Sequence, residues 1–238
     1  MVKISRTGVE KYLSCQRCFV LNYRYKVYPP SLPFTLNNAV DNLCKNEFDH
    51  YRKIKQPHPI FIKHDINAVP FIHKNLDDWR SNFKGIRYVN EIEGYNFGGA
   101  IDDVWVKPNG QLILADVKAT SKNEFNWEET WNRYEYPKAY QRQLEMYQWL
   151  FRKNGFNVAN EAYLVYFNGL KNEAMFDQTL RFELHMVKLI CNDNWVEDKV
   201  KEASTLLKSN EFPNASNSCE NCNYLRKRWK VSKSINRL

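Results

Sequence analysis

The stretch that decides the fold is FGGAIDDVWVKPNGQLILADVKAT, residues 97–120. Its centre, KPNG at residues 107–110, is typical of a tight turn, because proline fixes φ and glycine accepts a positive φ. On both sides of the turn apolar and polar residues alternate, which is the period of a β-strand. The stretch therefore predicts a β-hairpin.

Two aspartates face each other across the predicted hairpin. Folding it symmetrically about Asn109 places Asp102 opposite Asp116, and directly paired residues have Cβ atoms about 5 Å apart. Two carboxylates this close on a half-buried face repel each other unless a cation lies between them. Oxygen ligands favour Mg²⁺ or Mn²⁺ over Zn²⁺. The pair therefore predicts a metal site.

Lys118 lies two residues beyond Asp116 and projects from the same face of the strand. Hydrolysis of a phosphodiester requires an oriented water and stabilisation of the charge that grows on the phosphate, and a lysine can serve either purpose. The alternative is an exposed strand face with a surface salt bridge, because such triplets arise by chance in strands. The preceding turn and the facing Asp102 favour a catalytic lysine.

The elements expected around the hairpin give an α/β or α+β core in a single domain. Helices are expected at residues 5–25, 36–52, 73–83, 137–154 and 194–207, and strands at 86–93, 95–106, 111–119, 161–167 and 176–187. The first three strands are expected to form an antiparallel meander. Within the domain of residues 1–238 we expect a helical N-terminal part (1–60), a catalytic core (86–187) and a cysteine-bearing basic tail (219–238).

Charge and hydropathy point to nucleic acid rather than to a membrane. The apolar runs are too short to span a bilayer, and no signal peptide is recognisable, so we expect a cytoplasmic protein with reduced thiols. The net charge is +8, and the tail from Asn223 onward holds six basic residues and no acid. With Tyr224 and Trp229 among them, this tail suits a phosphate backbone and stacking bases. The alternative is a solvated, frayed terminus.

Three motifs together resemble a known family. Gly99–Asp102 followed by Asp116–Lys118 resembles motifs II and III of the PD-(D/E)XK nucleases, and Gln143–Tyr147 (QLEMY) resembles the Q-x-x-x-Y motif of their RecB-type branch, which includes the CRISPR adaptation exonucleases. The resemblance implies a restriction-endonuclease-like core with a central mixed sheet flanked by helices. It also implies that Gln143 and Tyr147 adjoin the metal site. Without the resemblance, Gln143 would be interpreted as a surface amide and Tyr147 as a core aromatic.

One position departs from the family pattern. Many relatives carry a histidine ligand on an early helix, in a G-x-x-x-H setting, and the resemblance makes Asp41 the matching residue here. A carboxylate can replace imidazole at Mg²⁺ and suits that harder ion. Asp41 can equally be a surface charge on the helix.

Two C-x-x-C pairs, Cys15 with Cys18 and Cys219 with Cys222, have the spacing of chelating thiolates. Iron–sulfur relatives place three cysteines near the C-terminus, but the third position here is Arg228. A two-plus-two site is the remaining arrangement. The spacing favours Zn²⁺ and the resemblance favours a [4Fe–4S] cluster, while the alternative is reduced, metal-free pairs.

These features predict a Mg²⁺- or Mn²⁺-dependent deoxyribonuclease that acts on DNA ends or single strands. The alternative from another class is a DNA-binding subunit that keeps the nuclease fold and does not cut. The complete set of Asp102, Asp116 and Lys118 favours the enzyme.

Overall fold

A computed structural model describes residues 1–31 and 35–235, and Arg237 of the predicted tail lies outside these ranges. The chain divides into two compact units. The first unit comprises residues 1–32, 89–97 and 197–238, and the second comprises residues 33–88 and 98–196. In the described ranges, no helix combines the length and the apolar character needed to cross a membrane.

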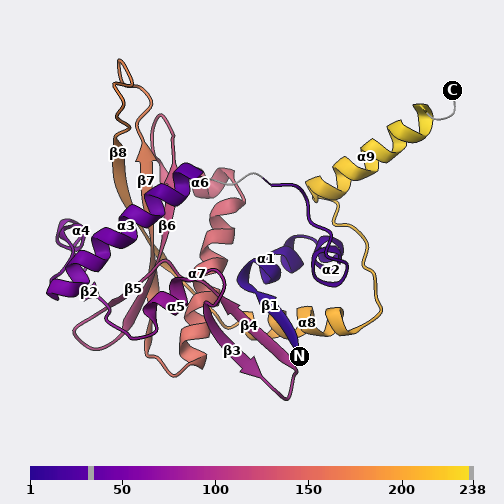
Figure 1. Cartoon of the computed structure of the whole chain (residues 1–238), viewed down its shortest axis with the longest axis horizontal. Coiled ribbons are helices and arrows are strands. Elements are labelled where there is room, and N and C mark those ends of the chain that lie inside the picture. The colour runs from indigo at the N-terminus through magenta and orange to yellow at the C-terminus, as the bar shows by residue number, and fades with distance from the viewer. Residues whose placement is uncertain (32–34, 236–238) are drawn as a thin grey trace. The chain divides into compact units, whose positions relative to one another are not determined.

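The second unit is built on a five-stranded mixed sheet, shown in Figure 1. Its strand order is β2-β5-β6-β7-β8, with β6 and β7 parallel and the other neighbours antiparallel. The strands are β2 (Val69–Pro70), β5 (Asp103–Val106), β6 (Leu112–Thr120), β7 (Val158–Gly169) and β8 (Phe182–Ile190). This architecture confirms the predicted α/β class with a central mixed sheet.

The β5–β6 hairpin has the register that its turn predicts. Asp103 pairs with Ala115, and Val106 pairs with Leu112, so the hairpin is symmetric about Asn109. Gly110 has a φ of +81°, a value that favours glycine. Its N–H donates to the carbonyl of residue 107 at 2.9 Å, which closes the turn.

Helices α3 (Thr35–Ile54) and α7 (Tyr136–Lys153) pack against opposite faces of β6. Ala115 belongs to a buried cluster with Phe48 of α3, whereas the next residue, Asp116, contacts Gln143 of α7. This alternation follows from the period of two along a strand. Helices α6 (Trp127–Arg133) and α7 together form the crossover that the parallel pair β6–β7 requires.

Two short helices complete the second unit, α4 (Pro59–Lys63) and α5 (Leu76–Arg80). Arg80 at the end of α5 and Arg52 of α3 both bind the carboxylate of Asp103, which is 1% exposed. Asp49 of α3 contacts both arginines as well. Burial raises the pKa of Asp103, and the two guanidinium groups oppose that shift. This buried ion network connects both helices to the first residue of β5.

In its described residues, the first unit contains helices α1 (Arg6–Ser14), α2 (Gln16–Arg24) and α9 (Glu220–Ile235), and all of α8 (Val196–Lys208) except its first residue. Strand β1 (Val2–Ser5) pairs with β4 (Tyr95–Gly99), which pairs with β3 (Ile86–Asn90) in a three-stranded sheet. Ser5 caps α1 as expected for a serine, since its Oγ accepts the N–H of Gly8 at 3.1 Å.

Several sequence-based boundaries are wrong, including the strand expected at residues 176–187, which is β8, and the helix expected at 73–83, which is α5. The strand expected at residues 95–106 is two strands, β4 and β5, which belong to different sheets. Between them Ile101 is fully buried and its N–H donates to Trp79 at 3.1 Å, so tertiary contacts bend the chain there. The large sheet has two antiparallel parts, β2-β5-β6 and β7-β8. The helix expected at residues 5–25 is divided at Cys15, which has extended backbone angles.

Candidate active site and cysteine site

Asp116 and Lys118 lie next to each other on the α7 face of β6. The Asp116 carboxylate is 1% exposed and forms an ion pair with the Lys118 ammonium. Burial alone lowers the pKa of Lys118, but the negative charges of Asp116 and then Asp102 outweigh it, so the pKa is raised. Lys118 therefore stays protonated at neutral pH.

Gln143 of α7 joins this pair. Its Nε2 donates to Oδ1 of Asp116 at 2.6 Å, and its Oε1 accepts from Nζ of Lys118 at 3.5 Å. One helical turn later, the hydroxyl of Tyr147 lies 3.2 Å from the same Nε2. Both Gln143 and Tyr147 are buried. The structure thus brings the two residues of the Q-x-x-x-Y motif to the Asp116–Lys118 pair.

Asp102 lies in the bend just before β5. The next residue, Asp103, pairs with Ala115, which directly precedes Asp116. Oδ2 of Asp102 accepts the backbone N–H of Val117 at 2.8 Å. Arg80 fixes its backbone, because Nε donates to the Asp102 carbonyl at 3.0 Å. Asp102 is therefore held against the segment of β6 that carries both Asp116 and Lys118.

Lys45 of α3 lies between Asp41 of the same helix and Asp102 and contacts both carboxylates. The sequence alone predicts no role for Lys45. The Lys45 ammonium lies 2.7 Å from Oδ2 of Asp41 and 3.2 Å from Oδ1 of Asp102. The sequence signal was the spacing of four residues between Asp41 and Lys45, which places them on one helix face. Burial and the charge of Asp102 raise the pKa of Asp41. Burial opposes the charged form of Lys45, but Asp102 and Asp41 raise its pKa overall.

The donor set fits a divalent metal. Carboxylate oxygens are the ligands that Mg²⁺ and Mn²⁺ prefer. Oδ1 of Asp41 is buried and has no hydrogen-bond partner among the described residues, so it can accept a further cation. Two ammonium groups, Lys45 and Lys118, lie next to the three aspartates and offset two of their three negative charges.

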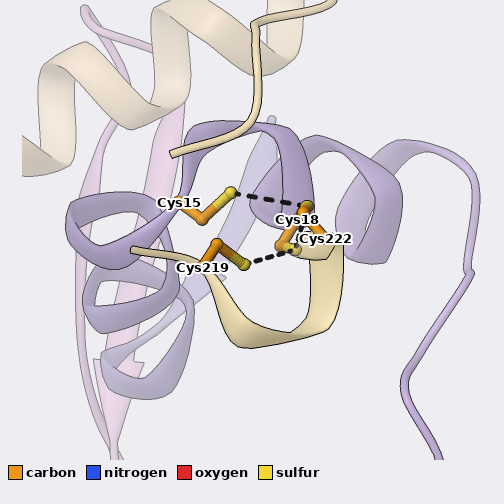
Figure 2. Close-up of side chains that lie close together, drawn as sticks. All are labelled: Cys15, Cys18, Cys219 and Cys222. Atoms are coloured by element: carbon orange, nitrogen blue, oxygen red, sulfur yellow. Dashed lines mark hydrogen bonds between the residues drawn. The ribbon is translucent and has the colours of Figure 1, made fainter. Parts of the chain in front are cut away.

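The four predicted cysteines meet within the first unit, as Figure 2 shows. Their sulfur atoms all lie within 4.8 Å of one another. Sγ of Cys18 is 3.4 Å from Cys222 and 3.6 Å from Cys219, and Sγ of Cys15 is 4.0 Å from Cys222. The four thiols can hold a metal ion.

The local backbone explains how Cys15 reaches this site. Its extended conformation (φ −164°, ψ 103°) separates α1 from α2. Burial raises the pKa of the Cys15 thiol, but hydrogen bonds from the backbone of Ser216 and Cys18, and from neighbouring thiols, lower it to about 7. Burial raises the pKa of Cys18 and of Cys222, so Cys15 is the thiol of these three that is held nearest to the thiolate form.

The basic tail is helical in the part of it that the structure describes. Helix α9 exposes the rings of Tyr224 and Trp229 and the basic side chains between them. Nζ of Lys233 lies 3.9 Å from the centre of the Trp229 ring. Residues 220–235 thus form a helix rather than a frayed segment, and the contact of this exposed helix with nucleic acid stays a prediction.

Comparison with known proteins gives one sequence match. The sequence model of the PD-(D/E)XK nuclease superfamily matches residues 33–226. No curated protein has a significantly similar sequence.

The solved structures that resemble this chain include two exonucleases. One is a protein from Eubacterium rectale that carries an exonuclease assignment, with 12% identity and a TM-score of 0.44 over 93% of this chain and 87% of that chain. The other is an alkaline exonuclease from Laribacter hongkongensis, with 12% identity and a TM-score of 0.40 over 87% of this chain and 86% of that chain. Because the superfamily model matches more than half of the residues, this chain belongs to the PD-(D/E)XK nuclease superfamily.

Proposed function

We propose that this nuclease hydrolyses DNA phosphodiester bonds with Mg²⁺ or Mn²⁺ and acts on ends or single strands. The observation that carries the proposal is the buried Asp116 carboxylate, bound to both Lys118 and Gln143 beside Asp102. An arrangement of buried charges has a large desolvation cost, which makes it more typical of a functional site than of a surface. DNA as the substrate, and the RecB-type branch, rest on the resemblance of residues 143–147 to that branch's motif.

Each residue has a distinct role in this proposal. Asp102 and Asp116 would hold the metal, with Asp41 as a third candidate. The metal, when bound, would polarise the phosphate and lower the pKa of a bound water. Lys118 is protonated, so its ammonium stabilises the negative charge that grows on the phosphate. Gln143 fixes the orientation of both Asp116 and Lys118, and Tyr147 fixes Gln143.

The competing proposal is a nucleic-acid-binding subunit that does not cut. It requires the same fold but no transition-state stabilisation. The buried ion pair of Asp116 and Lys118 has a desolvation cost that DNA binding alone does not require, which favours the enzyme.

Removing Asp116 or Lys118 tests the enzyme directly. We expect Asp116→Asn and Lys118→Met to lower the cleavage rate by about 100-fold or more, as loss of one electrostatic group commonly does. DNA affinity should change little, because binding draws on many phosphate contacts. The assay uses end-labelled single-stranded and duplex DNA with Mg²⁺ or Mn²⁺, circular DNA to separate end-dependent from internal cutting, and EDTA as a blank.

The exposed Asp77→Asn is the matched control and should retain full activity. Wild-type turnover by Asp116→Asn, with the same metal dependence, would show that the site is assigned wrongly. Tight DNA binding without cleavage by the wild-type protein with either metal would instead support the non-cutting subunit.

Lys45 gives a test of the metal site that does not depend on activity. Without metal, its ammonium separates the carboxylates of Asp41 and Asp102. In EDTA, we expect Lys45→Met to lower the free energy of unfolding by about 1–3 kcal/mol, because two half-buried carboxylates lose their counter-ion. Saturating Mn²⁺ should recover most of this loss, since an ion that binds the folded state stabilises it.

Urea unfolding in EDTA and in Mn²⁺ measures the loss of unfolding free energy and its recovery. Lys53→Met on the exposed side of the same helix is the matched control, and it should change neither value appreciably. An equal loss in EDTA and in Mn²⁺ would mean that the metal does not bind at Asp41 and Asp102.

For the four-cysteine site we propose a single Zn²⁺ ion. Four sulfurs at about 2.3 Å from one tetrahedral ion lie about 3.8 Å apart. Three of the Sγ–Sγ distances, at 3.4, 3.6 and 4.0 Å, are close to that value, and all of them are within 4.8 Å. A [4Fe–4S] cluster has a different iron behind each cysteine and therefore requires a wider spacing of the sulfurs.

Metal analysis of anaerobically purified protein checks the choice. We expect about one zinc per chain, no visible colour, and loss of the zinc in Cys18→Ser, because Cys18 lies at the centre of the sulfur contacts. Cys44→Ser, at a buried cysteine outside the group, is the control that should keep its zinc. A brown protein that absorbs near 400 nm would identify an iron–sulfur cluster. Protein that contains neither zinc nor iron would show that the cysteine pairs are reduced, metal-free thiols.

Helix α9 is proposed as a contact for the phosphate backbone. Replacing Lys227, Lys230 and Lys233 by Gln spares Cys222 and removes three positive charges. If all three contact phosphates, the slope of log affinity against log salt concentration should fall by about 0.9 per contact on duplex DNA and about 0.7 on single strands. Fluorescence anisotropy across a salt series measures the slope. The control variant replaces the exposed Lys53, Lys63 and Lys74 by Gln and should keep the wild-type slope. An unchanged slope in the α9 variant would show that α9 is solvated and does not contact phosphates.

A further inference from the structure

A row of tyrosine rings starts at Lys118 and leads away from it. Nζ of Lys118 lies 4.5 Å from the centre of the Tyr140 ring. The ring centres of Tyr140 and Tyr136 are 5.5 Å apart, and those of Tyr136 and Tyr134 are also 5.5 Å apart. Tyr136 and Tyr140 are four residues apart on α7, which places them on one face of the helix. We call these three residues the tyrosine row.

The outer two rings are not part of the core. Tyr134 is 42% exposed and Tyr136 is 38% exposed, whereas Tyr147, on the same helix near Gln143, is 2% exposed. The row therefore offers ring surface to solvent at one end and contacts the catalytic lysine at the other. The second unit contains the whole row and Lys118, so the arrangement is internal to that unit.

Cations flank the outer end of the row. Nζ of Lys122 lies 5.7 Å and the Arg133 guanidinium 5.4 Å from the centre of the Tyr134 ring. Two of the nearby acids are paired with cations, since Glu135 pairs with Lys138 at 2.7 Å and Glu129 pairs with Arg133 at 3.4 Å. Exposed aromatic rings with adjacent cations suit an anionic ligand that carries flat rings.

We propose that the tyrosine row is a stacking track for a single-stranded nucleic acid, whose bases lie on Tyr134 and Tyr136 while its backbone approaches Lys118. Each base that stacks on an aromatic side chain contributes about 1–3 kcal/mol without regard to sequence. Paired bases in a duplex have no free faces along the helix, so the track selects unpaired strands. The direction of the strand, with its backbone leading to Lys118, rests on the proposed nuclease function.

The test compares Tyr134→Ala/Tyr136→Ala with Tyr134→Phe/Tyr136→Phe. Tyr140 is kept, because it contacts Lys118. Binding of a fluorescent 15-nucleotide oligo-dT, measured by anisotropy in EDTA, should weaken by about 10-fold or more in the Ala pair. It should change by less than about twofold in the Phe pair, because the rings remain. Phe83→Ala, at a ring that is 99% exposed elsewhere in the second unit, is the control that should bind as wild type.

Three results would overturn the track: unchanged oligo-dT affinity in the Ala pair, an equal loss in the Phe pair, or an equal loss for a blunt duplex without unpaired bases. Thermal melts of each variant check that the fold is intact, as the exposure of both rings leads us to expect. Hydrolysis of thymidine 5′-(p-nitrophenyl phosphate) by the wild-type protein tests the proposed chemistry separately, because this substrate has no neighbouring bases. Failure of that hydrolysis counts against the nuclease proposal, and failure of the binding test counts against the track.

Discussion

The buried negative charge of Asp116 is the constraint on which the rest of the site depends. A carboxylate that is 1% exposed loses nearly all of its hydration, at a cost of several kcal/mol. Lys118 supplies the opposite charge and Gln143 supplies a hydrogen bond, so both must lie where β6 and α7 place them. The amide of Gln143 serves both partners because one of its ends donates to the carboxylate and the other accepts from the ammonium.

Adjacent aspartates at the start of β5 illustrate two different uses of charge. Asp103 is bound by two arginines, which remain protonated and form directional hydrogen bonds, so its site is closed and holds α3 and α5 to the sheet. Asp102 is neutralised by the single ammonium of Lys45, which is a point charge on a flexible side chain. Under the proposed function, a divalent cation would replace this single ammonium, whereas the two arginines would stay in place. Asp103 is thus a structural anchor, and Asp102 is the neighbouring carboxylate proposed to bind the metal.

Local chemistry explains which parts of the site could be predicted. The turn at residues 107–110 determines the register of β5 and β6, so the position of Asp102 opposite the Asp116 region follows from sequence. The four-residue spacing of Gln143 and Tyr147 likewise determines that they share a helix face. The bend that separates β4 from β5 could not be predicted, because it depends on a hydrogen bond from Ile101 to Trp79. Arg80 and the contact of Lys45 with Asp102 were missed for the same reason, since these partners are distant in sequence. The metal-binding roles of Asp41, Asp102 and Asp116 remain predictions.

The cysteine site addresses a different physical difficulty, which is the assembly of the first unit from three segments far apart in the chain. Its sulfur contacts join residues near the start of the chain to residues about 200 positions later, as between Cys18 and Cys219. Bringing such distant segments together costs loop-closure entropy, and a small unit has little apolar area with which to offset that cost. A metal bound by all four thiolates would contribute its binding free energy to folding, since the unfolded chain holds no preformed site. The extended backbone at Cys15, which divides α1 from α2, would then serve to direct the Cys15 thiolate toward the metal.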